Sequence, residues 1–281
     1  MNSYTDQELS QLHDTLYEIL GEIIRVCDLL DIPYFIQGGT AIGAFFEDSI
    51  LPWDDDIDIG MTRANYNRFL KEAPAVLGKQ YFLQWYGTDP HTPFYFAKLR
   101  KNNTVFLEHN YRNLPIHQGI YIDIFPFDKV PDTPWLQKAQ RTISNFFNCC
   151  FMGKEVWQWK HCGKCEIDTP TNRGFLPCLL QRTIQTPLSK SAILKILSWT
   201  QSCFNWLPKA TFYNIVLAPK DHIAVTTIEH PEQRPFGPLT VWAPSDLETY
   251  LRRHYRNLRR YIPKEEQMNH RPDELYFSSP S

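Results

Sequence analysis

Four carboxylates stand within five residues of this chain, at Asp54, Asp55, Asp56 and Asp58. Asp54, Asp56 and Asp58 share parity, so on a β-strand their side chains would point to one face. Like charges held that close repel each other and raise each other's pKa values. A divalent cation would neutralise them, and the spacing therefore predicts a metal site at Asp54, Asp56 and Asp58.

Two other interpretations of the aspartate run are weaker. Most charge runs are solvated turns, but the alternation from Asp56 to Ile59 is the pattern of a strand with a buried apolar face. A calcium loop starting at Asp54 would need glycine at its sixth position and glutamate at its twelfth, where this chain has Ile59 and Asn65. A hard cation such as Mg²⁺ or Mn²⁺, held by carboxylates and by substrate phosphates, fits better.

The segment before the aspartates carries a glycine pair. The apolar run at 34–36 predicts a strand that ends at Gly38 and Gly39, with a helix starting at Thr40. Gly-Gly-Thr, a helix and then a D-x-D strand resemble the nucleotidyltransferase superfamily. In that fold the glycine turn lets backbone amides approach a phosphate, whose charge the helix N-terminus favours. The resemblance implies that Gly38, Gly39 and Thr40 bind donor phosphates, and that a neighbouring strand supplies a third metal carboxylate.

The segment 119–128 offers that third carboxylate. It has a strong strand pattern, and Asp123 is flanked by Ile122 and Ile124. An unpaired aspartate in an apolar strand would be costly, and a shared metal would resolve that cost. We therefore expect Asp123 to lie on a strand beside the aspartate run and to complete its site.

Taken together, the blocks GGTAIGAFF, PWDDDIDIGM and IYIDIFPFD resemble the LicD family of phosphotransferases, which includes the fukutin-type enzymes. The resemblance covers residues 10–130 well and continues more weakly to the C-terminal region, where His270 resembles a family histidine. The family tends to have a Tyr-Gly-Asp turn there, and this chain has Tyr255-Arg256-Asn257 instead. Membership implies transfer of a substituted phosphate, such as phosphocholine from CDP-choline, onto a surface glycan of the lipopolysaccharide, capsule or teichoic acid type.

The resemblance also implies roles for the acids. Asp56, Asp58 and Asp123 would be catalytic and would hold one or two Mg²⁺ or Mn²⁺ ions, with Asp54 as a further ligand. Asp123 would take the proton from a sugar hydroxyl. The residues alone support only a metal-dependent phosphate-transfer site. A nucleotidyltransferase acting on a sugar phosphate, or a non-catalytic glycan-binding relative, stays an alternative.

Two basic residues are expected on the same face of a strand predicted at 94–100. Lys98 and Arg100 are two residues apart, so both could reach a substrate phosphate or, equally, line a solvated sheet edge. Arg63, just after the aspartate run, is a lesser candidate of the same type.

A group of cysteines and a group of arginines each allow both a functional and a purely structural interpretation. Cys149, Cys150, Cys162 and Cys165 have the residue types of a structural zinc site, but the first two are adjacent and stand in an apolar helical run, where buried cysteines are common. A basic stripe is predicted on the last helix and would suit a glycan phosphate or a peripheral contact with an anionic membrane, or simply face solvent. It consists of Arg252, Arg256, Arg259 and Arg260.

Composition narrows the class of protein. The chain has 281 residues and a formal net charge of −2, which gives no general attraction to nucleic acid. No apolar run reaches transmembrane length, and the first residues lack the regions of a signal peptide, so a cytoplasmic location is expected. Seven cysteines, an odd number, favour reduced thiols.

The expected fold is α/β, a nucleotidyltransferase-like mixed sheet flanked by helices, with an additional mostly helical C-terminal region. Residues 1–130 are expected to form the catalytic core, and 131–281 an extension that packs on the core and shapes the acceptor site. Periodicity predicts helices at 6–31, 135–152 and 189–207, a last helix opened by 244–246, and strands at 34–36, 81–86, 94–100, 119–128, 223–228 and 239–242.

Overall fold

A central mixed sheet carries the fold of this computed structural model, which describes residues 4–161, 187–217, 222–255, 257–267 and 269–278. The main path of the sheet runs in the order β1-β2-β6-β4-β3. Its strands are β1 (Phe35–Ile36), β2 (Asp58–Thr62), β3 (Tyr81–Gln84), β4 (Ala97–Lys101) and β6 (Tyr121–Val130). Only β2 and β6 pair in parallel, and the other pairs on this path are antiparallel. The predicted mixed α/β sheet is confirmed.

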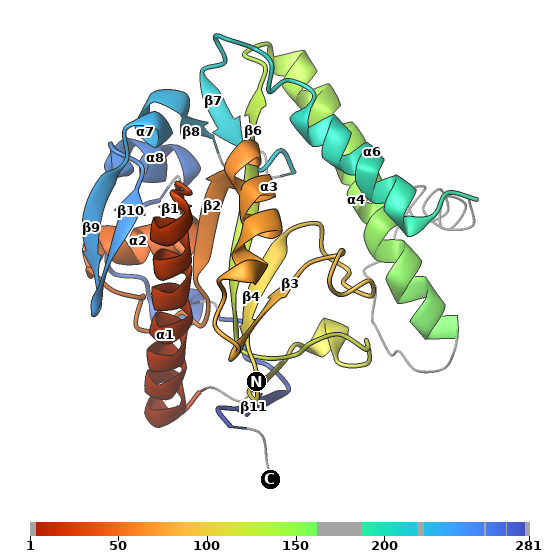
Figure 1. Ribbon diagram of the computed structural model, residues 1–281. Helices are drawn as coiled ribbons and strands as arrows, with labels where there is room; N and C mark the ends of the chain where they lie inside the picture. Colours follow the sequence, from red (N-terminus) through yellow and green to blue (C-terminus); the bar gives the residue numbers. More distant parts are fainter. Residues whose placement is uncertain (1–3, 162–186, 218–221, 256, 268, 279–281) are drawn as a thin grey trace.

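Helices α1 (Asp6–Leu30) and α3 (Arg63–Glu72) pack against strands β2, β4 and β6 (Figure 1). A capping box between Thr5 and Glu8 starts α1, and its stripe of leucine, isoleucine and valine is fully buried. Tyr66 and Phe69 bury the inner face of α3. The helix predicted at 6–31 therefore matches α1 to within one residue.

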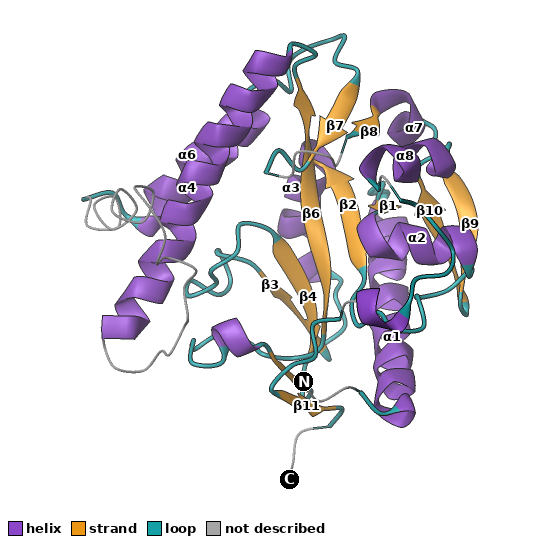
Figure 2. Ribbon diagram, turned by 180° about the vertical axis from the view of Figure 1, so that it is seen from behind, coloured by secondary structure: helices purple, strands orange, loops and turns teal. Residues whose placement is uncertain are grey.

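The chain beyond residue 130 adds both helices and strands to this core. Helices α4 (Pro134–His161) and α6 (Lys190–Ser202) form a hairpin along one flank, at the right of Figure 1 and the left of Figure 2. Strand β7 (Phe212–Asn214) pairs with the end of β6 and with β8 (Ile223–Ala224). The hairpin of β9 (Glu232–Phe236) and β10 (Leu239–Ala243) packs on β1, while β11 (Glu274–Tyr276) pairs with β5 (Val105–Leu107).

The remaining helices are short. They are α2 (Gly38–Phe46), α7 (Val225–Glu229), α8 (Leu247–His254) and the 3₁₀ turns Ala73–Ala75, His109–Tyr111 and Lys264–Glu266. A division of the chain into domains at residue 130 stays a prediction.

Several predicted boundaries differ from the structure, and those nearest the candidate site and the C-terminal region are the following. Helix α2 starts at Gly38 rather than Thr40, and the strand predicted at 223–228 turns into α7 after two residues. Helix α8 ends at His254, so it ends before Arg259 and Arg260 of the predicted basic stripe and carries Arg252. Strand β2 starts only at Asp58, because the chain turns at 51–54 and the ladder with β6 opens at the pair Asp58 and Asp123.

Candidate metal and phosphate site

The two inner strands of the sheet bring Asp58 and Asp123 side by side. They are register partners in the parallel pair β2–β6, so their side chains lie on the same face. The backbone N–H of Asp123 donates to the carbonyl of Ile57 at 3.1 Å. The backbone N–H of Asp58 donates to the hydroxyl of Thr40 at 2.8 Å. The predicted position of Asp123, on the strand next to the aspartate run, is confirmed.

Asp54 and Asp58 both approach the first turn of α2. A Cβ added at Gly39 would lie 2.8 Å from Asp54 Oδ2, and one at Gly38 would lie 3.2 Å from Asp58 Oδ2. Gly38 also has φ +59°, a conformation that glycine adopts without strain. The glycines are therefore points of close approach, and the binding of donor phosphates at this turn stays a prediction. What approaches them is a pair of carboxylates, which the positive end of the helix stabilises.

The aspartates of the run do not share one strand, yet they act on one another. Burial, followed by repulsion from Asp56 and Asp55, raises the pKa of Asp54 to about 8. Burial also raises the pKa of Asp58 well above its usual value, with Asp56, Asp123 and Asp54 adding to the rise. The four predicted metal ligands thus form one electrostatic cluster, although Asp54 and Asp56 precede β2 rather than belong to it.

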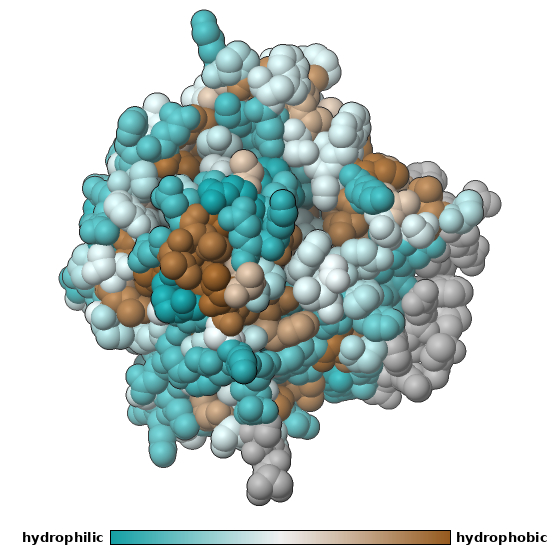
Figure 3. All heavy atoms as spheres, viewed as in Figure 1, coloured by the Kyte–Doolittle hydropathy of each residue, from teal (hydrophilic) through white to brown (hydrophobic). Residues whose placement is uncertain are grey.

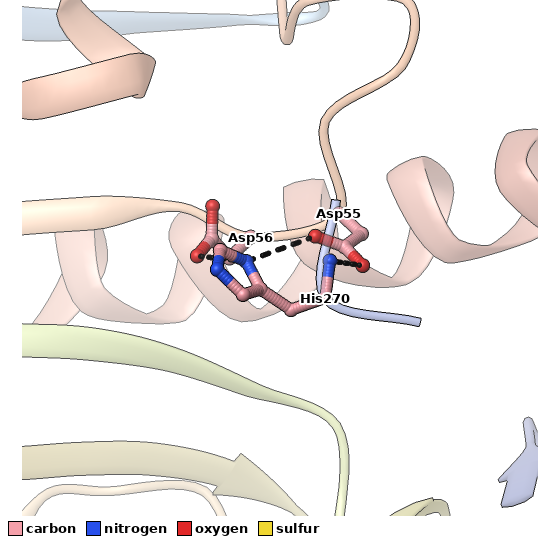
Figure 4. A group of neighbouring side chains, drawn as sticks. All are labelled: Asp55, Asp56 and His270. Atoms are coloured by element: carbon pink, nitrogen blue, oxygen red, sulfur yellow. Dashed lines mark hydrogen bonds and ion pairs between the residues drawn. The ribbon is translucent and has the colours of Figure 1, made fainter. Parts of the chain in front are cut away.

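Asp55 binds two segments that lie near the two ends of the described chain. Its carboxylate accepts hydrogen bonds from the Tyr4 hydroxyl at 2.8 Å and from the His270 backbone N–H at 2.7 Å. The His270 ring then lies with Nδ1 3.7 Å from Asp55 Oδ1 and 3.9 Å from Asp56 Oδ2 (Figure 4). The hydrogen bond to Asp55, and then the charges of Asp56, Asp55 and Asp54, raise the pKa of His270 to about 9.

Lys98 meets Asp123 from the neighbouring strand β4. Its Nζ lies 3.0 Å from Asp123 Oδ1, 3.7 Å from Glu108 Oε2 and 3.3 Å from the centre of the Tyr121 ring. Burial and Glu108 raise the pKa of Asp123 against the opposite effect of Lys98, to about 6. Sequence reasoning missed Glu108, because it follows the short strand β5 and no pattern in the sequence marks it.

These groups line a cavity of about 250 Å³. Asp56, Asp123, Lys98, Glu108 and His270 form its polar wall. Its remaining lining is largely aromatic, with Phe94, Tyr95, Phe96, Tyr111 and Tyr121, and α4 contributes Asn148 and Met152. The cavity therefore places an aromatic surface directly beside the carboxylate cluster.

The carboxylate cluster fits a hard divalent cation. Its donors are carboxylate oxygens, the ligands that Mg²⁺ and Mn²⁺ prefer. Lys98 and His270 offset only part of the negative charge of Asp54, Asp56, Asp58 and Asp123. Asp55, Asp56 and His270 also have ligand atoms within 4.8 Å of one another. Raised carboxyl pKa values mark a site that is short of positive charge.

Arg100 and Arg63 lie away from the cavity. Arg100 is fully buried, and its guanidinium donates to Gln84 Oε1 and, at 2.6 Å, to the Gly119 carbonyl. Arg63 forms a buried ion pair with Asp128 and also reaches Gln201 of α6. Both arginines therefore tie elements of the fold together, and of the two predicted phosphate-binding cations on β4 only Lys98 lines the cavity.

We expect Arg100→Met to lower the free energy of unfolding by about 3–5 kcal/mol, because it leaves the buried acceptors of Gln84 and Gly119 without their donor and removes the contact of Arg100 with Glu108 at 3.6 Å. Urea unfolding of the purified variant measures the loss. Arg252→Met is the matched control, since Arg252 is exposed and its ion pair is with Glu248 one turn away on the same helix. Equal stability of the two variants would contradict the structural role of Arg100.

The cysteines predicted as a possible zinc site are only partly within the described residues. Cys150 is buried beside Phe151 and Ile193, and Cys149 is its half-buried neighbour on α4. Cys162 and Cys165 lie outside the described residues, so the zinc site stays a prediction.

The prediction of a basic stripe on one face of the last helix is wrong. Arg259 and Arg260 lie beyond the end of α8, where Arg259 pairs with Glu266 and Arg260 pairs with Glu47. Arg256 lies outside the described residues.

Comparison with known proteins matches the segment of the chain that contains the candidate site. Residues 31–154 match the model of the LicD/FKTN/FKRP nucleotidyltransferase domain. The chain is 30% identical over 151 residues to the lipopolysaccharide cholinephosphotransferase LicD of Haemophilus influenzae, covering 50% of this chain and 52% of that protein. It is 25% identical over 114 residues to an uncharacterised protein of Rickettsia typhi, covering 41% of this chain and 34% of that protein.

The chain thus spans about half the length of the first of these relatives and less of the second. Among the described residues, no helix has the length and hydropathy needed to cross a bilayer. The matched segment contains both glycines of the α2 turn and all four aspartates of the cluster. Residues 31–154 therefore match a nucleotidyltransferase domain of the LicD type, and they contain the carboxylate cluster of the candidate site.

Proposed function

We propose that this protein is a metal-dependent phosphotransferase that moves a substituted phosphate, of the phosphocholine kind, from a CDP-linked donor to a hydroxyl of a surface glycan. The observation that carries the proposal is that Asp54 and Asp58 approach the first turn of α2, Asp123 lies beside Asp58, and Asp56 and Asp123 line the aromatic cavity. The similarity to a lipopolysaccharide cholinephosphotransferase supports the choice of donor and acceptor.

Each group has a role in this proposal. Asp56, Asp58 and Asp123, with Asp54, hold Mg²⁺ or Mn²⁺, which when bound neutralises charge on the donor pyrophosphate and on the leaving nucleotide. The glycine turn and Thr40 hold Asp54 and Asp58 against the first turn of α2, whose N-terminal end would favour a donor phosphate beside the metal. Lys98 reaches the cavity from β4 and donates to a phosphoryl oxygen there.

The acceptor enters through the cavity in this proposal. Asp123 lies on the cavity wall, where it can take the proton from an attacking sugar hydroxyl. The rings of Phe94, Phe96 and Tyr111 offer faces for a sugar or for the donor head group. The side chains of Asn148 and Met152 bring the hairpin into this wall, so the C-terminal extension also contributes to the substrate site.

The by-product of the reaction tests the proposal. Purified protein with Mg²⁺, CDP-choline and a lipopolysaccharide or sugar acceptor should release CMP and place phosphocholine on the acceptor, as phosphorus NMR and mass spectrometry would record. A nucleotidyltransferase would instead release pyrophosphate from CTP and leave CMP on a sugar phosphate. Pyrophosphate from CTP, with no CMP from a panel of CDP-linked alcohols, would replace the proposal by that alternative.

A further inference from the structure

The α4–α6 hairpin has one end that is rich in exposed tryptophan. The helices are antiparallel, because Gln140 of α4 donates to the carbonyls of Thr200 and Gln201 near the end of α6. The start of α4 and the end of α6 therefore lie together, at the top of Figure 1. We call Trp135, Trp199 and Trp206 at this end the tryptophan tip.

The three indoles of the tip are strongly exposed. Trp135 in the first turn of α4 is 69% exposed, Trp199 in the last turn of α6 is 68% exposed, and Trp206 is 74% exposed. The segment of Trp206 is held at the same end, because Lys129 of β6 bonds to Asn205 and to the Leu207 carbonyl. Other hydrophobic side chains reach the surface along the hairpin (Figure 3). Large aromatic side chains are normally buried, so three exposed ones at one end indicate a binding surface.

The tip is also basic. The segments 133–145 and 195–210 contain Lys138, Arg141, Lys195 and Lys209 and no aspartate or glutamate, in a chain whose net charge is −2. Of the two acids before α4, Asp128 forms an ion pair with Arg63, and the exposed Asp132 accepts a hydrogen bond from the Thr211 backbone. The four cations of these two segments therefore outnumber Asp132, the exposed acid just before the start of α4.

We infer that the tryptophan tip docks on an anionic lipid surface. Tryptophan is enriched at membrane–water interfaces, where its ring is apolar on one side and its N–H is wet. Each lysine or arginine near an anionic leaflet adds about 1 kcal/mol of attraction. The partner is a lipid surface rather than a second copy, because a symmetric dimer would press the same lysines against each other, and protein interfaces are depleted in lysine.

This docking is compatible with an open active site. Asp123 is the third residue of β6 and Val130 is its last, so the tip lies at the far end of that strand from the carboxylate cluster. The separation along the strand is about 23 Å, at about 3.3 Å for each residue. The tip would hold the protein at a surface while the cavity stays free, and its binding can be measured without any assay of catalysis.

Co-sedimentation with vesicles tests the inference. The parent protein should sediment with vesicles of three parts phosphatidylcholine and one part phosphatidylglycerol, much less with pure phosphatidylcholine, and less as salt rises. The variant W135S/W199S/W206S and the variant K138E/K195E/K209E should each bind at least about tenfold more weakly. The control L29S/Y261S removes exposed side chains elsewhere and should bind like the parent.

Circular dichroism and urea unfolding establish that each variant is folded, and single tryptophan variants replace the triple variant if it is not. The inference is overturned if the parent does not sediment with the anionic vesicles, or if the tryptophan variant sediments as well as the parent. Light scattering tests the alternative occupant. If the parent is a dimer and only the tryptophan substitutions dissociate it, a second copy of the chain covers the tip instead.

Discussion

Replacing Asp58 with asparagine is expected to lower transferase activity by at least about 1,000-fold, because a bound cation supplies several kcal/mol of charge stabilisation in the transition state. Asp58 sits between Asp56, Asp123 and Asp54, and all three act on its charge. The steady-state rate with Mg²⁺ and CDP-choline measures the loss. Without metal the variant should be at least as stable as the parent, since one member of a cluster of like charges is gone.

Urea unfolding in the presence of a chelator checks the second part of that expectation. Asp14→Asn, an exposed change on α1, is the matched control and should alter neither activity nor stability. A variant at Asp58 that keeps more than about a tenth of the parent activity would remove this aspartate from the catalytic machinery, since a tenfold effect is only about 1.4 kcal/mol.

Gly39→Val is expected to weaken donor binding by about 100-fold or more while it costs about 1–2 kcal/mol of stability. The new Cβ would lie 2.8 Å from Asp54 Oδ2, so the carboxylate must move away from the first turn of α2. A movement of about 1 Å at such a site is costly for catalysis. Equilibrium binding of the CDP-linked donor with Mg²⁺, followed by calorimetry, measures the effect.

Gly21→Ala is the control for Gly39→Val. Gly21 lies within α1, and a Cβ there would meet only Leu239 Cδ2 at 3.9 Å, an ordinary contact. Alanine at this position should leave donor binding unchanged and raise helix stability slightly. Donor affinity in folded Gly39→Val equal to that of this control would place the donor phosphates away from the α2 turn.

The strand that carries Asp123 could be predicted because local pattern and pairing agree there. Its alternating apolar side chains fill the core on both sides, and the pairing with β2 then sets Asp123 beside Asp58. The extension of that pattern to Asp54 and Asp56 was wrong. Strand β1 has only two residues, and the turn at 51–54 keeps the chain from joining β6 before Asp58.

The residues that sequence reasoning missed depend on contacts between distant segments. Glu108 reaches Lys98 only because the chain after β5 returns to the side chains of β4. His270 reaches Asp56 only because β11 pairs with β5 and Asp55 holds its backbone. Lys98 and Arg100 share a face of β4, as their spacing predicted. Only Lys98 lines the cavity, because Gln84 and Gly119 bind the guanidinium of Arg100, and no periodicity reveals these partners.

The central claim is that Asp54, Asp56, Asp58 and Asp123 form a divalent metal site, and a Mn²⁺ titration followed by electron paramagnetic resonance tests it most directly. The parent should bind one or two Mn²⁺ ions, Mg²⁺ should compete for them, and Asp58→Asn and Asp123→Asn should each lose this binding while Asp14→Asn keeps it. Mn²⁺ binding that is absent from the folded parent, or that is unchanged in Asp58→Asn, would contradict the account.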